Sequence, residues 1–378
     1  MASWELPRRK RLRVDWEAKT ARGKDEDAPL PVSDDDLSRT AFKQRLAQQP
    51  GRLRLPGIAV AVCTRGCPPE RLREWLFWHL AQGVAVIFMR WEGPLSPQQE
   101  AVLRGPRERG ELRLEVLAKC KASSGFQAVM SRQIKFTQRC FQQARDSGCD
   151  FMVHMDDDEL LFPVKAEHRI PDVFRRHEGR TTRCVHFRNL EAVFRFIATS
   201  DRPFSRPLTL FRNAKQVLYC NGKSAAHLRA PGGVFCSGVH HFCRYDRTFV
   251  NPSPEFGLHD DGSGCSDPSC CALEEAAVIL HFDSPSFEEW RAKFEARAAS
   301  RLNVDDQEEM DIFPFKKESV DAFQNADLSV CEREEVYRKW RCLPGRAVES
   351  FDADIDGKVV AERFSTLLLD ARAAREPL

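Results

Sequence analysis

The sequence contains no long hydrophobic run. Nowhere in its 378 residues do apolar side chains approach the ~20 consecutive positions that a membrane-spanning helix needs. The N-terminal segment MASWELPRRKRLRVDWEAKTARGKDED has basic residues but no apolar stretch behind them, unlike a secretory signal. The sequence as given therefore predicts no membrane span in this chain and favours the cytoplasm.

An excess of one charge is also missing. The 58 Lys and Arg residues nearly cancel the 56 Asp and Glu residues, and the formal net charge is +2. A protein that binds DNA or RNA with its bulk surface is usually far more basic. The balance therefore predicts no nucleic-acid partner.

The 14 cysteines show no clear framework. The densest group lacks the C-x-x-C spacing of most structural zinc sites, and a chain of this length does not need disulfides to fold. A zinc site and disulfides both stay open there, and so does the redox state. This group is Cys236, Cys243, Cys265, Cys270 and Cys271.

Apolar material for a core is plentiful. Hydrophobic residues make up 42% of the chain, with 26 Phe and 7 Trp. The first 54 residues are polar, charged and aperiodic, which predicts a disordered tail and linker over 1–54. The remainder divides into a domain over 55–301 and a helical C-terminal extension over 302–378.

Strands and helices alternate in the first half of this domain. Apolar runs rich in β-branched residues predict buried strands near 57–64, 84–91, 111–118 and 149–155. Amphipathic segments between them predict helices near 68–83, 96–105 and 125–148. The alternation predicts an α/β fold with a mainly parallel sheet flanked by helices.

The second half is less regular. Its apolar runs predict strands near 181–194, 207–213, 216–228 and 274–282. Its periodic segments predict helices near 286–302, 331–340 and 359–374.

The stretch FMVHMDDDELLFP places four adjacent acids directly after a buried strand. In parallel sheets ligands bind beyond the carboxyl ends of the strands. Carboxylate oxygens there suit Mg²⁺ or Mn²⁺, which keep few protein ligands and accept phosphate oxygens. On extended chain Asp156 and Asp158 face the same way and Asp157 is turned aside. The alternative interpretation is a solvated acidic loop.

Four stretches, taken in order, resemble the glycosyltransferases of family 92 and their family-2-like relatives. The match runs from Ile58 to Phe294, and each motif alone is weak. One departure is Phe282, which stands where these enzymes usually have Tyr. The stretches are IAVAVCTRGCPPERLREWLFWHLAQGVAVIFM, GCDFMVHMDDDELLFP, NGKSAAHLRAPGGVFCSGVHHF and ILHFDSPSFEEWRAKF.

The resemblance implies a GT-A-like, Rossmann-like fold and a metal-dependent hexosyltransferase. Such an enzyme moves a sugar from a nucleotide-sugar, here a UDP-sugar, to the hydroxyl of a glycan, lipid or protein acceptor, with inversion. The implied cofactor is Mn²⁺ or Mg²⁺. Asp156, Asp158 and His240 match the positions of its ligands. The family also implies the Golgi or secretory pathway, against the cytoplasm favoured above.

Further site residues follow from the same resemblance. Thr64 and Arg65 stand where nucleotide contacts begin, together with Asp156. Lys223 would pair with the diphosphate as a point charge, unless it is a surface lysine. Glu159 beside the metal pair would orient the metal or the sugar, unless it caps the following segment. Inverting transfer also needs a carboxylate base. The candidates for the base are Glu191, Asp260, Asp261 and Asp283.

Two other functions stay open from the sequence. A metal-dependent phosphohydrolase would use the same acids to activate water, and a non-catalytic GT-A-like module would bind a nucleotide-sugar without turnover. We also expect that removing Asp156 or Asp158 relieves repulsion, so that stability holds or rises.

Overall fold

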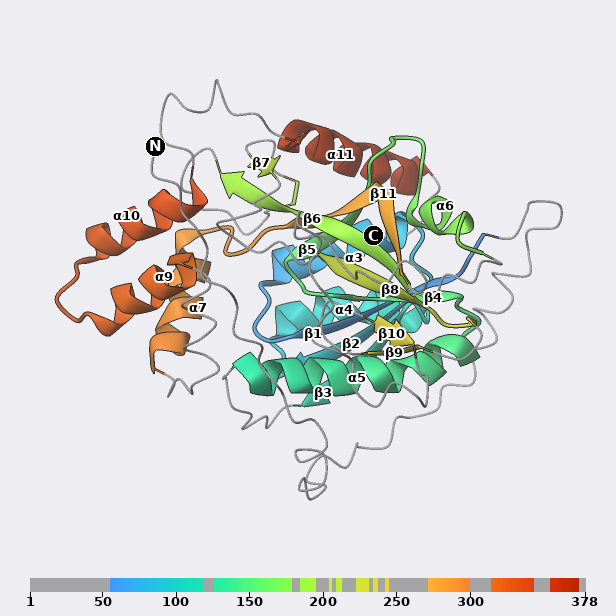
Figure 1. Ribbon diagram of the computed structural model, residues 1–378, viewed down its shortest axis with the longest axis horizontal. Coiled ribbons are helices and arrows are strands. Elements are labelled where there is room, and N and C mark those ends of the chain that lie inside the picture. Colours follow the sequence, from blue (N-terminus) through green and yellow to red (C-terminus); the bar gives the residue numbers. More distant parts are fainter. Residues whose placement is uncertain are drawn as a thin grey trace, which may run out of the picture.

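The computed structural model describes residues 55–117, 126–178, 184–194, 204–205, 209–212, 222–230, 234–236, 242–244, 271–299, 314–342 and 354–373. Within them it forms an α/β fold, a large twisted sheet with helices on both faces (Figure 1). The strands are β1 Ile58–Thr64, β2 Val86–Glu92, β3 Leu112–Leu117, β4 Phe151–Met155, β5 Glu159–Pro163, β6 Cys184–Phe194, β7 Thr209–Arg212, β8 Lys223–His227, β9 Val234–Cys236, β10 Phe242–Arg244, β11 Cys271–His281 and β12 Ile355–Asp356. The helices are α3 Pro69–Ala81, α4 Pro97–Glu108, α5 Phe126–Asp146, α6 Ile170–Arg175, α7 Phe287–Ala299, α9 Pro314–Gln324, α10 Val330–Arg341 and α11 Gly357–Ala373.

The main sheet has the order β12-β7-β6-β8-β4-β1-β2-β3, and β11 and β5 extend it beside β6. Its first half is parallel, as the strand–helix alternation predicts: β4, β1, β2 and β3 all run the same way. The second half adds antiparallel neighbours, because β8 pairs with β4 and β6, and β5 pairs with β11. The predicted α/β class is confirmed, with a sheet that is mixed as a whole.

Strand β1 shows how the sheet is covered on both faces. Ile58, Val60 and Val62 join the apolar cluster that includes α3. Ala59 and Ala61 point the other way, into a cluster with α5. Because side chains alternate along a strand, a run without polar residues is needed to fill both layers. Figure 1 shows α5 lying along one face of the sheet.

Helix α3 ends in a sharp turn at Gly83. The glycine has φ of +92°, and a Cβ there would lie 3.0 Å from the Pro171 side chain. Any other residue would therefore be strained and crowded at this position. The turn returns the chain to β2, beside β1.

The C-terminal helices complete the fold. Helices α7, α9 and α10 lie together at one end of the molecule, and α11 lies over α3 (Figure 1). The ring of Trp290 in α7 contacts Phe323 and Tyr337, and its Nε1 donates to Ser319 Oγ at 3.1 Å. Strand β12 pairs with β7, so this part of the chain also reaches the main sheet. Helix α9 was not predicted from the sequence.

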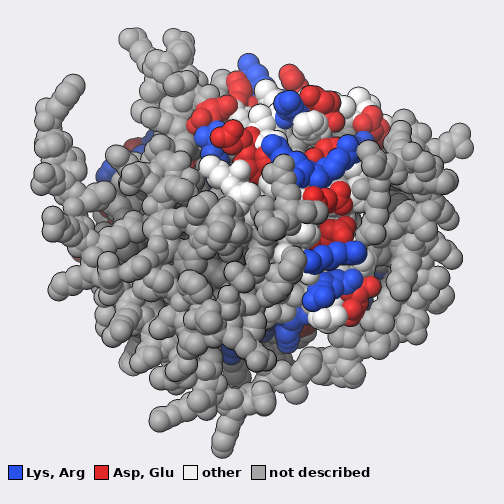
Figure 2. Space-filling model, turned by 45° about the vertical axis from the view of Figure 1, so that its right-hand side comes forward, with Lys and Arg blue, Asp and Glu red and all other residues white. Residues whose placement is uncertain are grey.

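The charged surface is mixed. On the face shown in Figure 2, Lys and Arg side chains alternate with Asp and Glu over the described residues. No helix of the described residues is long and apolar enough to cross a membrane.

Candidate active site

The acidic residues lie in the turn between β4 and β5, at the carboxyl edge of the parallel strands. The register of the neighbouring strands determines which side chains lie beside this turn. Glu159 pairs with His281 across β5 and β11, and His281 pairs with Glu191 across β11 and β6. Three ionisable residues far apart in the sequence therefore stand in one row beside the turn.

Lys223 lies at the centre of the cluster. Its side chain is 0% exposed, and Nζ lies 2.6 Å from Asp156 Oδ2 and 3.3 Å from Glu159 Oε2. Gln133 of α5 donates to the other oxygen of Asp156, at 3.0 Å. The alternative interpretation of Lys223 as a surface lysine is therefore wrong.

Burial raises the pKa of both Asp156 and Glu159, and Lys223 lowers the pKa of both, but the net result differs between them. Burial alone would raise the pKa of Asp156, but the ammonium of Lys223 lowers it well below its usual value. In Glu159 burial prevails and raises the pKa to about 7. Asp156 is accordingly the main anionic partner of the lysine.

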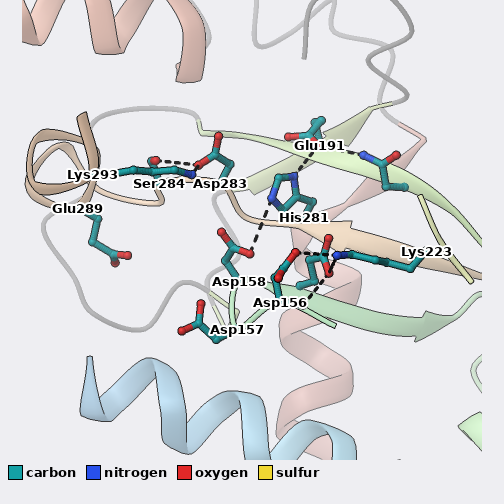
Figure 3. Close-up of polar contacts among 12 residues, drawn as sticks. Asp156, Asp157, Asp158, Glu191, Lys223, His281, Asp283, Ser284, Glu289 and Lys293 are labelled. Atoms are coloured by element: carbon teal, nitrogen blue, oxygen red, sulfur yellow. Dashed lines mark hydrogen bonds and ion pairs between the residues drawn. The ribbon is translucent and has the colours of Figure 1, made fainter. Parts of the chain in front are cut away.

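Asp158 faces His281. The imidazole Nε2 lies 3.7 Å from Asp158 Oδ1, and Nδ1 lies 2.6 Å from Glu191 Oε1 (Figure 3). Burial would lower the pKa of His281, but Glu191 and then Asp158 raise it to about 10. The ring is thus a cation held between two carboxylates. Glu191 also accepts from Asn189 Nδ2 at 2.9 Å and faces Arg341 Nη1 at 3.6 Å.

Asp157 is turned aside, but residues 157 and 158 form a turn, so the extended chain from which this direction was predicted is not present. The Thr64 hydroxyl at the end of β1 donates to it, and Arg71 Nη2 lies 3.3 Å from its Oδ1. The same guanidinium binds Glu289 of α7. Arg71 therefore links three elements at the edge of the site.

Asp283 lies just beyond His281 and has partners of its own. Lys293 of α7 and the Ser284 hydroxyl donate to it (Figure 3). Burial would raise the pKa of Asp283, but Lys293 lowers it well below its usual value. This carboxylate is consequently a weak proton acceptor.

Backbone contacts fix the shape of the turn. Trp75 Nε1 donates to the carbonyl of Glu159 at 2.8 Å, and the amide of Asp156 donates to Glu159 Oε2 at 2.9 Å. The amide of Phe282 donates to the carbonyl of Asp158 at 2.8 Å. The turn is therefore held from α3 and from β11.

The structure brings together many of the residues predicted from the sequence. Asp156, Asp158, Glu159, Lys223 and Glu191 meet around the turn. The hydroxyl of Thr64 reaches the turn through Asp157, whereas Arg65 is exposed in the bend after β1. His240, Asp260 and Asp261 lie outside the described residues.

Four contacting residues were not predicted from the sequence. They are Arg71, Trp75, Gln133 and Glu289, all on helices. Arg71, Trp75 and Glu289 lie in stretches that resemble the family, whereas Gln133 lies in none of them. Membership of such a stretch does not identify the partner of a side chain.

Comparison with known proteins identifies the family. The sequence model of glycosyltransferase family 92 matches residues 59–312, more than half of the chain. No curated protein sequence matches. Similar solved structures include HddC from Yersinia pseudotuberculosis, with 9% identity and a TM-score of 0.28 over 62% of this chain and 97% of that chain. They also include the apo structure of the WbbM bifunctional glycosyltransferase, with 8% identity and a TM-score of 0.19 over 35% of this chain and 23% of that chain. The chain belongs to glycosyltransferase family 92 and is a glycosyltransferase.

Proposed function

We propose that this glycosyltransferase moves a sugar from a UDP-sugar to an acceptor hydroxyl, with inversion and with the help of Mn²⁺ or Mg²⁺. The observation that carries the proposal is the acidic turn itself. Asp156 and Asp158 project at the carboxyl edge of the sheet, and cationic side chains stand behind them. A nucleoside diphosphate with its counterion is the ligand that this edge of an α/β sheet suits.

The donor atoms of the turn fit a divalent cation. Asp158 is 18% exposed, and its nearest ion-pair partner among the described residues is His281 at 3.7 Å. Asp156 is 31% exposed and keeps lone pairs beyond those used by Lys223 and Gln133. In the described part of the chain no three His, Cys, Asp or Glu side chains are arranged to hold a metal. Mg²⁺ and Mn²⁺ commonly take their remaining ligands from phosphate and water, and His240 stays a predicted ligand.

The protein's own cations would hold the site in position. Lys223 is too deeply buried to reach a diphosphate directly, so we assign it to orienting Asp156 and Glu159. His281 would orient Asp158 in the same way, supported by Glu191. When bound at Asp156 and Asp158, the divalent ion would neutralise the charge that develops on the departing diphosphate.

Release of the nucleoside diphosphate tests the proposal. The purified protein would be incubated with a panel of nucleotide-sugars, with Mn²⁺, with Mg²⁺ and with EDTA. We expect UDP from a UDP-sugar only when the divalent ion is present. Inorganic phosphate as the product would instead support a phosphohydrolase, and donor binding without any release would support a non-catalytic module.

A further inference from the structure

Glu289 is a carboxylate at the site to which the sequence analysis assigned no role, although it lies in the stretch ILHFDSPSFEEWRAKF. It lies in the first turn of α7, where its amide donates to Ser286 Oγ at 3.2 Å. Its carboxylate binds Arg71, whose other nitrogen lies 3.3 Å from Asp157 Oδ1. A single guanidinium therefore ties Glu289 to the acidic turn.

The carboxylate of Glu289 lies beside the acidic turn. Figure 3 shows it on the side of Asp157 and Asp158 opposite to Lys223. Burial first, and then the charges of Asp157 and Asp158, raise its pKa although Arg71 lowers it. A raised pKa improves a carboxylate as a proton acceptor, because the best base titrates near the working pH.

The other described candidates for the base are less suitable. Glu159 and Glu191 have side chains only 1% exposed, so an acceptor hydroxyl cannot reach them without rearrangement. Asp283 has Lys293 bound to it and a strongly lowered pKa. The side chain of Glu289 is 20% exposed, which leaves its carboxylate open to a substrate.

We propose that Glu289 is the catalytic base that takes the proton from the acceptor hydroxyl. The acceptor oxygen forms a bond to the anomeric carbon of the sugar as its proton passes to the Glu289 carboxylate. The bond from the anomeric carbon to the diphosphate oxygen breaks, and its electron pair leaves with UDP. The protonated Glu289 then returns its proton to water. This assignment rests on the proposed inverting transfer.

Glu289→Gln tests the assignment, with Glu288→Gln as the matched control. Glu288 is the neighbouring residue on the same helix turn and is exposed. Glutamine keeps an oxygen for Arg71 but cannot accept the proton. With water as the acceptor, we expect UDP release by E289Q to fall about 100-fold or more. E288Q should release UDP at the parent rate, and both variants should bind UDP-sugar as the parent does.

Azide separates a catalytic role from a structural one. Azide attacks the anomeric carbon without losing a proton, so it should restore UDP release by E289Q and form a glycosyl azide. A residue that only anchors Arg71 would not be rescued. The assignment is overturned if E289Q keeps the parent rate, if it loses donor binding to the same extent as turnover, or if azide has no effect.

The result also separates this inference from the proposed function. A parent protein that releases UDP while E289Q is unaffected refutes Glu289 alone. A parent that releases no nucleotide from any donor refutes the transferase, and the assignment of Glu289 falls with it.

Discussion

At the scale of single residues, three cations with little exposure to solvent explain how four adjacent acids tolerate one another. Lys223, His281 and Arg71 approach the turn from a strand, a second strand and a helix. Like charges this close would otherwise oppose ionisation and folding. Each cation faces a different acid, so the repulsion expected from the sequence is largely offset by pairing.

Lys223→Met should destabilise the protein strongly. The change leaves Asp156 and Glu159 without their shared counterion in a buried place. Removing one partner of a buried pair costs about 3–5 kcal/mol. Urea unfolding measures this loss, and Lys135→Met at an exposed position of α5 is the control. A loss no larger than that of the control would show that Lys223 is not the counterion of the turn.

Asp156→Ala should cost more stability than Asp158→Ala. The sequence alone predicts that neither change is costly, but Asp156 accepts from Lys223 at 2.6 Å and Asp158 has only a 3.7 Å partner. We expect a loss of about 1–3 kcal/mol for Asp156→Ala, since Glu159 still faces the lysine. Little change is expected for Asp158→Ala. Equal unfolding free energies in urea would contradict this order.

At the scale of elements, α3 supports the turn through a histidine that is buried in its neutral form. His79 is 0% exposed; its Nδ1 donates to the Trp75 carbonyl at 2.9 Å, and Nε2 accepts from the Leu161 amide at 3.4 Å. Burial lowers its pKa to about 4. Helix α3 and strand β5 are thus joined by a group that must stay unprotonated.

Acid should therefore weaken the junction of α3 and β5. An unfolded histidine takes up a proton near pH 6.5, while folded His79 does so only near 4. The unfolded state then binds more protons between these values, so the free energy of unfolding falls as the pH falls through this window. The contribution of His79 between pH 7 and pH 5 is about 2 kcal/mol. His79→Gln should remove this part of the pH dependence, measured by urea unfolding at both pH values; an unchanged slope would contradict the assignment.

Local sequence patterns predicted the helices and strands better than they predicted which strands pair and which side chains meet. The parallel half of the sheet followed from the alternation of apolar strands with helices between β1 and β4. The antiparallel half did not, because β8 and β11 pair with strands far away in sequence, and local periodicity does not record pairing. The acids of the turn were likewise predicted, since they are adjacent in the chain. Arg71 and Glu289 were not, because 218 residues separate these two partners.

At the scale of the whole molecule, the C-terminal helices reach the candidate site. Arg341 of α10 is 1% exposed and lies 3.6 Å from Glu191, and the Tyr337 hydroxyl donates to the Ser284 carbonyl at 3.2 Å. The same helix covers Trp290 of α7. The boundary predicted at 301 stays a prediction, but these contacts couple the predicted extension to the domain.

A chain that ends at residue 313 should not fold cooperatively. It keeps the whole family match, but it exposes Trp290 and removes Arg341 from the buried Glu191. Losses of this kind cost several kcal/mol each, which is comparable with the stability of a whole domain of about 5–15 kcal/mol. A chain without residues 1–54 is the control and should melt at the parent temperature. A cooperative transition of the shorter chain near the parent temperature would contradict the expectation.

The rate of UDP release by Asp158→Asn tests the central claim most directly, that the acidic turn is the centre of sugar transfer. The parent, D158N and the exposed control D146N would be compared with the same UDP-sugar and Mn²⁺. We expect D158N to lose at least about 100-fold in rate with its unfolding free energy preserved, because a ligand for the diphosphate counterion is lost. D146N should match the parent. Parent-like release of UDP by a folded D158N would contradict the account.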